Sequence, residues 1–93
     1  MSAQRQPNEF GIEIRVAIRR GMLARVALAL GKRGYTINAM TITDIDDRQK
    51  KMALIIQGDP KQLYSALHQI ERLVDVIEVK QVESVELDDR VIR

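Results

Sequence analysis

The chain has 93 residues, enough for one small domain, and its 45% hydrophobic and 30% charged content is typical of a folded protein. Its 15 Lys and Arg against 13 Asp and Glu give a net charge of only +2. The sequence has no Cys, which excludes a disulfide framework, a thiolate nucleophile and a thiolate metal site. Its single His excludes a multi-His metal centre. It has no long apolar run, which excludes a membrane span. A small binding or regulatory domain is the expected class.

Neither end of the chain has hydrophobic periodicity. Residues 1–10 are mostly polar and lack the apolar run of a signal peptide, so they predict a flexible N-terminal tail and a cytoplasmic protein. Residues 86–93 predict a charged C-terminal tail. The folded domain is therefore expected over residues 11–85.

The first half of the domain reads as strand, helix, strand. Alternation from Ile12 to Ile18 predicts a half-buried strand, with Ile12, Ile14, Val16 and Ile18 on one face. Gly21 then breaks the chain, and a helix follows that Gly31 and Gly34 are expected to stop. The stripe expected to face the core is Met22, Leu23, Val26, Ala27 and Leu30.

The segment 36–43 is rich in β-branched residues and predicts the second strand. Simple alternation would place Asn38, Met40 and Ile42 on one face of this strand. It would place Ile37, Ala39 and Thr41 on the other face.

The second half reads as strand, helix, strand. A polar hairpin over 44–49 leads to a nearly continuous apolar strand over 52–57, which predicts a central strand covered on both faces. Asp59 is expected to cap the next helix, with Pro60 at its first position and Leu63, Leu67, Ile70 and Leu73 facing the core. The last strand is expected from Val74 to Val82 or Val85.

The order β-α-β-β-α-β predicts an α+β ferredoxin-like sandwich, a four-stranded antiparallel sheet with two helices on one face. The other face and at least one long aliphatic edge would lack a cover within the chain. A homodimer that extends the sheet side by side is therefore expected.

Three other functional classes are disfavoured. RNA recognition on this fold needs exposed sheet aromatics, and the predicted central strands have none. Asp44, Asp46 and Asp47 lack the length, Gly and terminal Glu of a calcium loop, so a solvated hairpin tip is expected. His68 has no nearby acid or nucleophile in the pattern. We expect no catalytic residue, cofactor, metal or nucleic acid.

The turn 19–22 is the informative segment. A glycine allows the backbone to approach another group closely, and the start of the helix offers unpaired N–H donors. The junction between strand and helix could thus receive the carboxylate of a free amino acid. Gly21 could equally serve the geometry of a tight turn alone.

The stretch from Val16 to Met40, VAIRRGMLARVALALGKRGYTINAM, resembles the opening strand-helix-strand of ACT domains. The nearest resemblance is to the small regulatory subunits of acetolactate (acetohydroxyacid) synthase, in which the helix ends in a basic, Gly and aromatic run like the segment 32–37 here. The segment 69–79, QIERLVDVIEV, is similar to a second characteristic ending of those subunits.

The resemblance implies a noncatalytic subunit that binds and activates the thiamine-diphosphate-dependent large subunit. In that family two ACT domains pair side by side and bind an effector amino acid such as valine between them. The corresponding positions here are Gly21 and Met22 in the turn, with Arg20 beside them, and Thr36 and Ile37 at the start of the neighbour's second strand.

The sequence departs from the family pattern at three places. Ile18 replaces the usual Asn, Arg20 the usual Pro and Thr36 a second Asn, so two amide side chains suited to an amino acid are missing. These changes favour weak or absent feedback by valine. The alternative function is a stand-alone ACT-type amino-acid sensor that regulates a different enzyme. An acylphosphatase-like enzyme is less favoured, because no phosphate loop is present.

Overall fold

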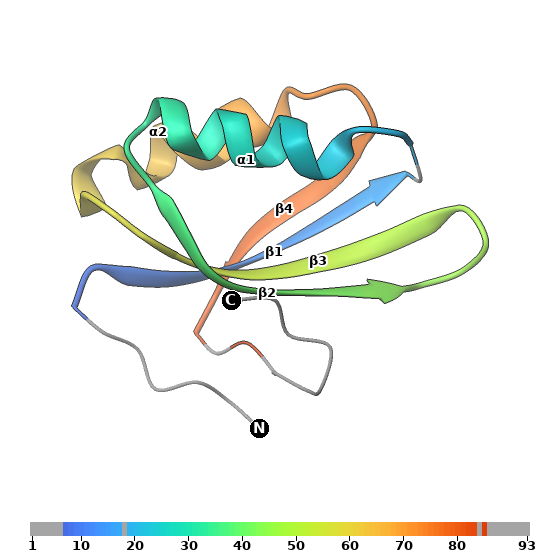
Figure 1. Ribbon diagram of the computed structural model, residues 1–93, viewed down its shortest axis with the longest axis horizontal. Helices are drawn as coiled ribbons and strands as arrows, with labels where there is room; N and C mark the ends of the chain where they lie inside the picture. Colours follow the sequence, from blue (N-terminus) through green and yellow to red (C-terminus); the bar gives the residue numbers. More distant parts are fainter. Residues whose placement is uncertain (1–6, 18, 84, 86–93) are drawn as a thin grey trace.

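Four strands form one antiparallel sheet in the order β2-β3-β1-β4, and two helices cover one of its faces (Figure 1). The computed structural model describes residues 7–17, 19–83 and 85. In chain order the elements are β1 (Glu9–Ala17), α1 (Met22–Lys32), β2 (Thr36–Asp44), β3 (Gln49–Gln57), the short 3₁₀ turn η1 (Pro60–Gln62), α2 (Leu63–Glu71) and β4 (Val76–Val82). This order confirms the predicted ferredoxin-like α+β fold.

The main core lies between the sheet and the helices. Strand β1 contributes Ile12, Ile14 and Val16, which are buried as their alternation predicted. Burial of each such aliphatic side chain is worth about 1.5–3 kcal/mol relative to exposure. The helices contribute Met22, Val26 and Leu30 from α1 and Leu63, Ala66 and Ile70 from α2.

Strand β3 is central, as predicted, because it pairs with both β1 and β2. Its Met52, Leu54 and Ile56 point into the main core. The intervening Ala53 and Ile55 are buried on the opposite face, in a second cluster with Ala39 and Val85. The continuous apolar run of β3 therefore does have apolar contacts on both faces.

A β-bulge in β2 corrects the predicted faces of this strand. Ile37 lies opposite Ile56, but the next pair is Ala39 with Ile55, so Asn38 is an extra residue that lies opposite no residue of β3 in this register. Ile37 consequently packs on the main core together with Met40 and Ile42, and not with Ala39. The simple alternation was wrong at Ile37 because it assumed an uninterrupted strand.

Several predicted boundaries also move. Strand β1 begins at Glu9, so residues 9 and 10, assigned to the N-terminal tail, belong to the sheet, and the Asn8 carbonyl accepts a 3.1 Å hydrogen bond from the Gly58 N–H. Helix α1 continues through Gly31 to Lys32. Strand β4 begins only at Val76, after Asp75 turns the chain with a φ of 76°. Ile18 and the predicted tail 86–93 lie outside the described residues.

Candidate functional site

The turn before α1 has the geometry that its glycine predicted. Gly21 adopts a left-handed φ of 82° and is the N-cap of α1, and no side chain in the described part of the chain hydrogen-bonds to the start of this helix. The Gly21 carbonyl accepts the first helical hydrogen bond, 3.0 Å from the Arg25 nitrogen. The N–H groups of the first turn are therefore uncapped by side chains of the described residues, and Arg20, next to Gly21 in the sequence, is exposed.

A hollow of about 230 Å³ lies beside this turn. Its walls are mainly apolar, but two cations also line it: Arg19, which is 3.5 Å from Asp75, and Lys50, which is 3.7 Å from Asp44. Apolar walls beside cations and helix N–H donors suit a small ligand that has an aliphatic part and a carboxylate. The other lining residues are Val16, Ala17, Gly21, Met22, Leu23, Ile42 and Met52.

Thr36 and Ile37 lie at the opposite end of β2 from this hollow. Thr36 pairs with Gln57 at the start of β2, whereas Ile42, which lines the hollow, pairs with Met52. Ile42 is six positions further along the strand than Thr36, roughly 20 Å at about 3.3 Å per residue. A single chain thus places Gly21 and Met22 at the hollow, whereas Arg20 is not among its lining residues and Thr36 and Ile37 lie far away.

A small polar network occupies the start of β2, and the sequence did not predict it. The Asn38 amide donates to Gln57 Oε1 at 2.9 Å and also to a carboxylate oxygen of Glu9. The Thr36 hydroxyl donates to Asn38 Oδ1 at 3.3 Å. An Asn within a β-branched strand was the available signal, because strands are depleted in Asn and a bulge can accommodate it.

His68 and Asp46 make contacts within their own segments of the chain. The His68 ring stacks on Tyr64 with 6.2 Å between centroids, and both residues are exposed on α2. Asp46 serves the hairpin turn, accepting from the Arg48 and Gln49 N–H groups at 2.7 and 2.8 Å. Within the described residues, no three His, Asp or Glu side chains gather in a metal-binding group, and no helix is both long and apolar enough to span a membrane.

The chain belongs to the ACT domain family, whose model matches residues 18–79. This agrees with the resemblance inferred from the segments 16–40 and 69–79. The predicted ACT domain is thereby confirmed.

The curated relatives are small subunits of acetolactate synthase. A probable acetolactate synthase small subunit of Archaeoglobus fulgidus is 33% identical over 73 residues, covering 76% of this chain and 45% of that protein. The acetolactate synthase isozyme 3 small subunit of Escherichia coli is 35% identical over 63 residues, covering 67% of this chain and 39% of that protein. The chain spans less than half the length of these relatives.

Solved structures agree on the fold. The acetolactate synthase small subunit of Thermotoga maritima superposes with a TM-score of 0.67 at 23% identity, covering 78% of this chain and 46% of that one. The ACT domain of a GTP pyrophosphokinase from Chlorobium tepidum gives 0.66 at 17% identity and covers 80% of this chain and 96% of that one.

Proposed function

We propose that this chain is a noncatalytic regulatory subunit of acetolactate synthase, acting in the cytoplasm on branched-chain amino acid synthesis. The observation that carries the proposal is the 33–35% identity to acetolactate synthase small subunits across most of the chain. The subunit would act by binding one conformation of the thiamine-diphosphate-dependent large subunit more tightly and so increasing the population of that active conformation.

The proposed regulatory unit is a homodimer in which two β2 strands pair antiparallel about a two-fold axis. Strand β2 is an edge strand, so one side of its backbone has no strand beside it within the described part of the chain. The Thr41 hydroxyl, on the same strand, is buried and has no hydrogen-bond partner among the residues that the structure describes. A second β2 would supply partners to the backbone edge and a cross-strand neighbour to Thr41.

This arrangement would complete the effector site. Antiparallel pairing about the two-fold axis places the start of one β2 beside the end of the other, so Thr36 and Ile37 of one copy approach the Gly21 hollow of its partner. The uncapped N–H groups at Gly21 and Met22, together with Arg20, would hold the carboxylate of an amino acid effector. Thr36 would add one hydroxyl from the other copy.

The amides that the family places at positions 18 and 36 are replaced by Ile18 and Thr36, so we propose that feedback by valine is weak or absent. Asn38 lies beside Thr36 but uses its amide N–H₂ within its own chain, on Gln57 and Glu9. It therefore does not simply replace the missing donor.

Reconstitution tests the proposed function directly. The chain is mixed with the catalytic large subunit of acetolactate synthase from the same organism, and acetolactate formation and complex formation are measured. We expect a stable complex and a higher rate than that of the large subunit alone. Absence of both would contradict the proposal. Tight binding of an amino acid by calorimetry, without any complex, would instead favour a stand-alone sensor.

A further inference from the structure

The charge of the chain is unevenly distributed around α1. Between Glu13 and Asp44 the sequence contains no acidic residue, so the helix and its flanking turns are purely cationic although the net charge is only +2. The basic residues of this segment are Arg15, Arg19, Arg20, Arg25, Lys32 and Arg33. Such a surface attracts acidic partners over a range of about a Debye length.

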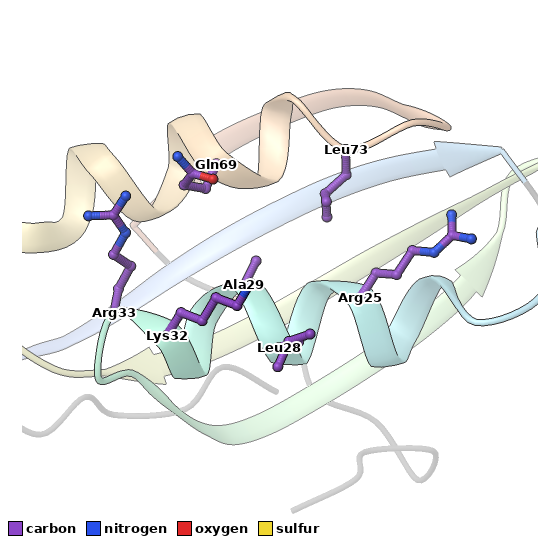
Figure 2. Close-up of a pocket in the computed structure, with 7 residues that line it drawn as sticks. All are labelled: Arg25, Leu28, Ala29, Lys32, Arg33, Gln69 and Leu73. Carbon is purple, nitrogen blue, oxygen red and sulfur yellow. The ribbon is translucent and has the colours of Figure 1, made fainter.

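Half of these cations surround a groove between the two helices. The groove has a volume of about 360 Å³ and is lined by Arg25, Lys32 and Arg33 on the α1 side and by Gln69 on α2. Figure 2 shows Leu73, in the turn after α2, pointing toward α1 near the Arg25 end of the groove, with Arg33 at the other end. Leu28 and Ala29 of α1 also line the groove.

Among the described residues, none forms an ion pair with the cations of the groove, and its apolar edge is exposed. Within the described part of the chain Arg25, Lys32 and Arg33 have no ion pair, in contrast to Arg19, which pairs with Asp75. Leu28 is 61% exposed at its edge. A cationic rim around an exposed leucine is complementary to a binding partner that has both carboxylates and apolar surface.

We propose that this groove, defined by Arg25, Leu28, Lys32, Arg33, Gln69 and Leu73, is the docking surface for a protein segment in which an aliphatic side chain is flanked by carboxylates. The proposal rests on the proposed function, since it assigns that segment to the catalytic subunit. A free inorganic anion would satisfy the cations but leave the exposed Leu28 in water, so charge and apolar surface together favour a protein segment.

The test measures the affinity of the full chain for the catalytic subunit by titration, at low and at high salt. Arg25→Glu/Lys32→Glu should weaken binding at least about tenfold and reduce its salt dependence. Arg25→Gln/Lys32→Gln should also weaken binding of the catalytic subunit, and it should destabilise the helix less because it adds no negative charge. Leu28→Ala should weaken binding about threefold or more, because its exposed side chain contributes to the contact but little to the core.

The matched control is Arg48→Glu/Lys61→Glu, which makes the same charge change at exposed residues of the hairpin and of η1. Thermal unfolding confirms that each variant is folded. If the wild-type chain binds and the groove variants bind as tightly as this control, the docking proposal is overturned while the proposed function stands. If the wild-type chain does not bind, both are overturned.

A small polyanion is the competing occupant. Tripolyphosphate that raises the melting temperature of the wild-type chain, but not that of Arg25→Glu/Lys32→Glu, would overturn the docking proposal in favour of a phosphate site. No such shift, together with weaker binding of the catalytic subunit by the groove variants, supports it.

Discussion

Gly21 holds the turn between β1 and α1 in a left-handed conformation, with φ of 82° and no heavy atom within 4 Å of where a Cβ would lie. The cost of a side chain there is therefore one of backbone strain alone. Gly21→Val should lower the free energy of unfolding by about 1–3 kcal/mol and weaken any effector response, as measured by urea unfolding and calorimetry.

Gly31 is the matched control for that prediction. It lies in α1 without a positive φ, and it too has open space around its Cα. Gly31→Ala should raise the free energy of unfolding by about 0.5–1 kcal/mol, because alanine loses less backbone entropy in a helix. Equal destabilisation by Gly21→Val and Gly31→Ala would contradict the special role of Gly21.

Gly58 meets a different constraint, which is lack of space. A Cβ on Gly58 would lie 2.6 Å from Cδ1 and 2.8 Å from Cε1 of the buried Tyr35 ring. Gly58→Ala should thus lower the unfolding free energy by about 1–3 kcal/mol through overpacking. In a Tyr35→Leu background the further loss should be smaller, and a double-mutant cycle measures this coupling. Strictly additive losses would show that the ring is not what excludes the methyl group.

The Tyr35 hydroxyl donates a hydrogen bond to the Asp59 carbonyl. Burial, and secondarily the charge of Asp59, raises the pKa of Tyr35 in the folded chain. The unfolded chain therefore ionises first, and the stabilisation by this hydroxyl is present below the ordinary pKa of about 10 and is lost as the pH rises beyond it.

We accordingly expect Tyr35→Phe to cost about 1 kcal/mol near neutral pH, the worth of one hydrogen bond. The difference in unfolding free energy from the wild type should shrink as the pH is raised above about 10. Urea unfolding across this range measures it, and a constant difference would contradict the assignment. Tyr64→Phe, at a ring that is 82% exposed, controls for removal of a tyrosine hydroxyl at the surface.

At the scale of single elements, the β2–β3 hairpin depends on one of its three aspartates. Asp46 accepts two backbone hydrogen bonds, from Arg48 and Gln49, whereas Asp47 accepts none in the described structure. Asp46→Ala should lower the unfolding free energy by about 0.5–1.5 kcal/mol, and Asp47→Ala should change it little. Chemical unfolding of both variants measures the contrast, and calcium should stabilise neither. A larger loss in Asp47→Ala would refute the assigned turn.

Element order was predictable because each element carries a strong local signal. Alternation marks β1, and Asp59 with Pro60 marks the start of the second helical segment, where Asp59 caps the Lys61 N–H at 2.9 Å as expected. Periodicity sums over many residues, so a single exception does not erase it.

The predicted strand faces and element boundaries that were wrong depend on residues distant in the sequence. The bulge at Asn38 places Ile37 in the core and provides hydrogen bonds from Asn38 to Gln57 and Glu9, and neither partner can be read from β2 itself. Strand β1 likewise begins at Glu9 because Gln57 is available to pair with it. Gly31 continues α1 since Gly34, with φ of 81°, already provides the left-handed residue that ends it.

The candidate site was predictable only in its parts. The Gly21 turn has a local signature, and the structure places Gly21 and Met22 beside one hollow. Thr36 and Ile37 lie at the other end of β2, so their role depends on a second copy of the chain. The family resemblance suggested that dependence, whereas composition and periodicity indicated only an uncovered edge.

At the scale of the whole molecule, the edge strand β2 decides whether the two halves of the site meet. The absence of Cys from the sequence makes this testable, because any introduced cysteine is the only thiol in the chain. Ala39 and Thr41 lie near the middle of β2, on the face opposite the helices, and each is 5% exposed. In an antiparallel β2–β2 pair, same-face residues near the two-fold axis lie within about 4.5–5.5 Å of each other at Cβ.

Oxidation of Thr41→Cys, or of an equimolar mixture of Thr41→Cys and Ala39→Cys, should therefore produce a disulfide-linked dimer on a non-reducing gel. Lys80→Cys on β4, the other edge strand, is the control. Lys80 is exposed, so its thiol would react faster if cross-linking arose only from random collisions, whereas a buried β2 thiol reacts only if the partner strand already lies beside it. Preferential cross-linking at β2 supports the completed site, provided that it persists when the protein is diluted to concentrations still above the dissociation constant of the dimer. Preferential cross-linking at Lys80, as random collisions would give, would contradict the β2–β2 pair and leave Thr36 too far from Gly21 to share an effector.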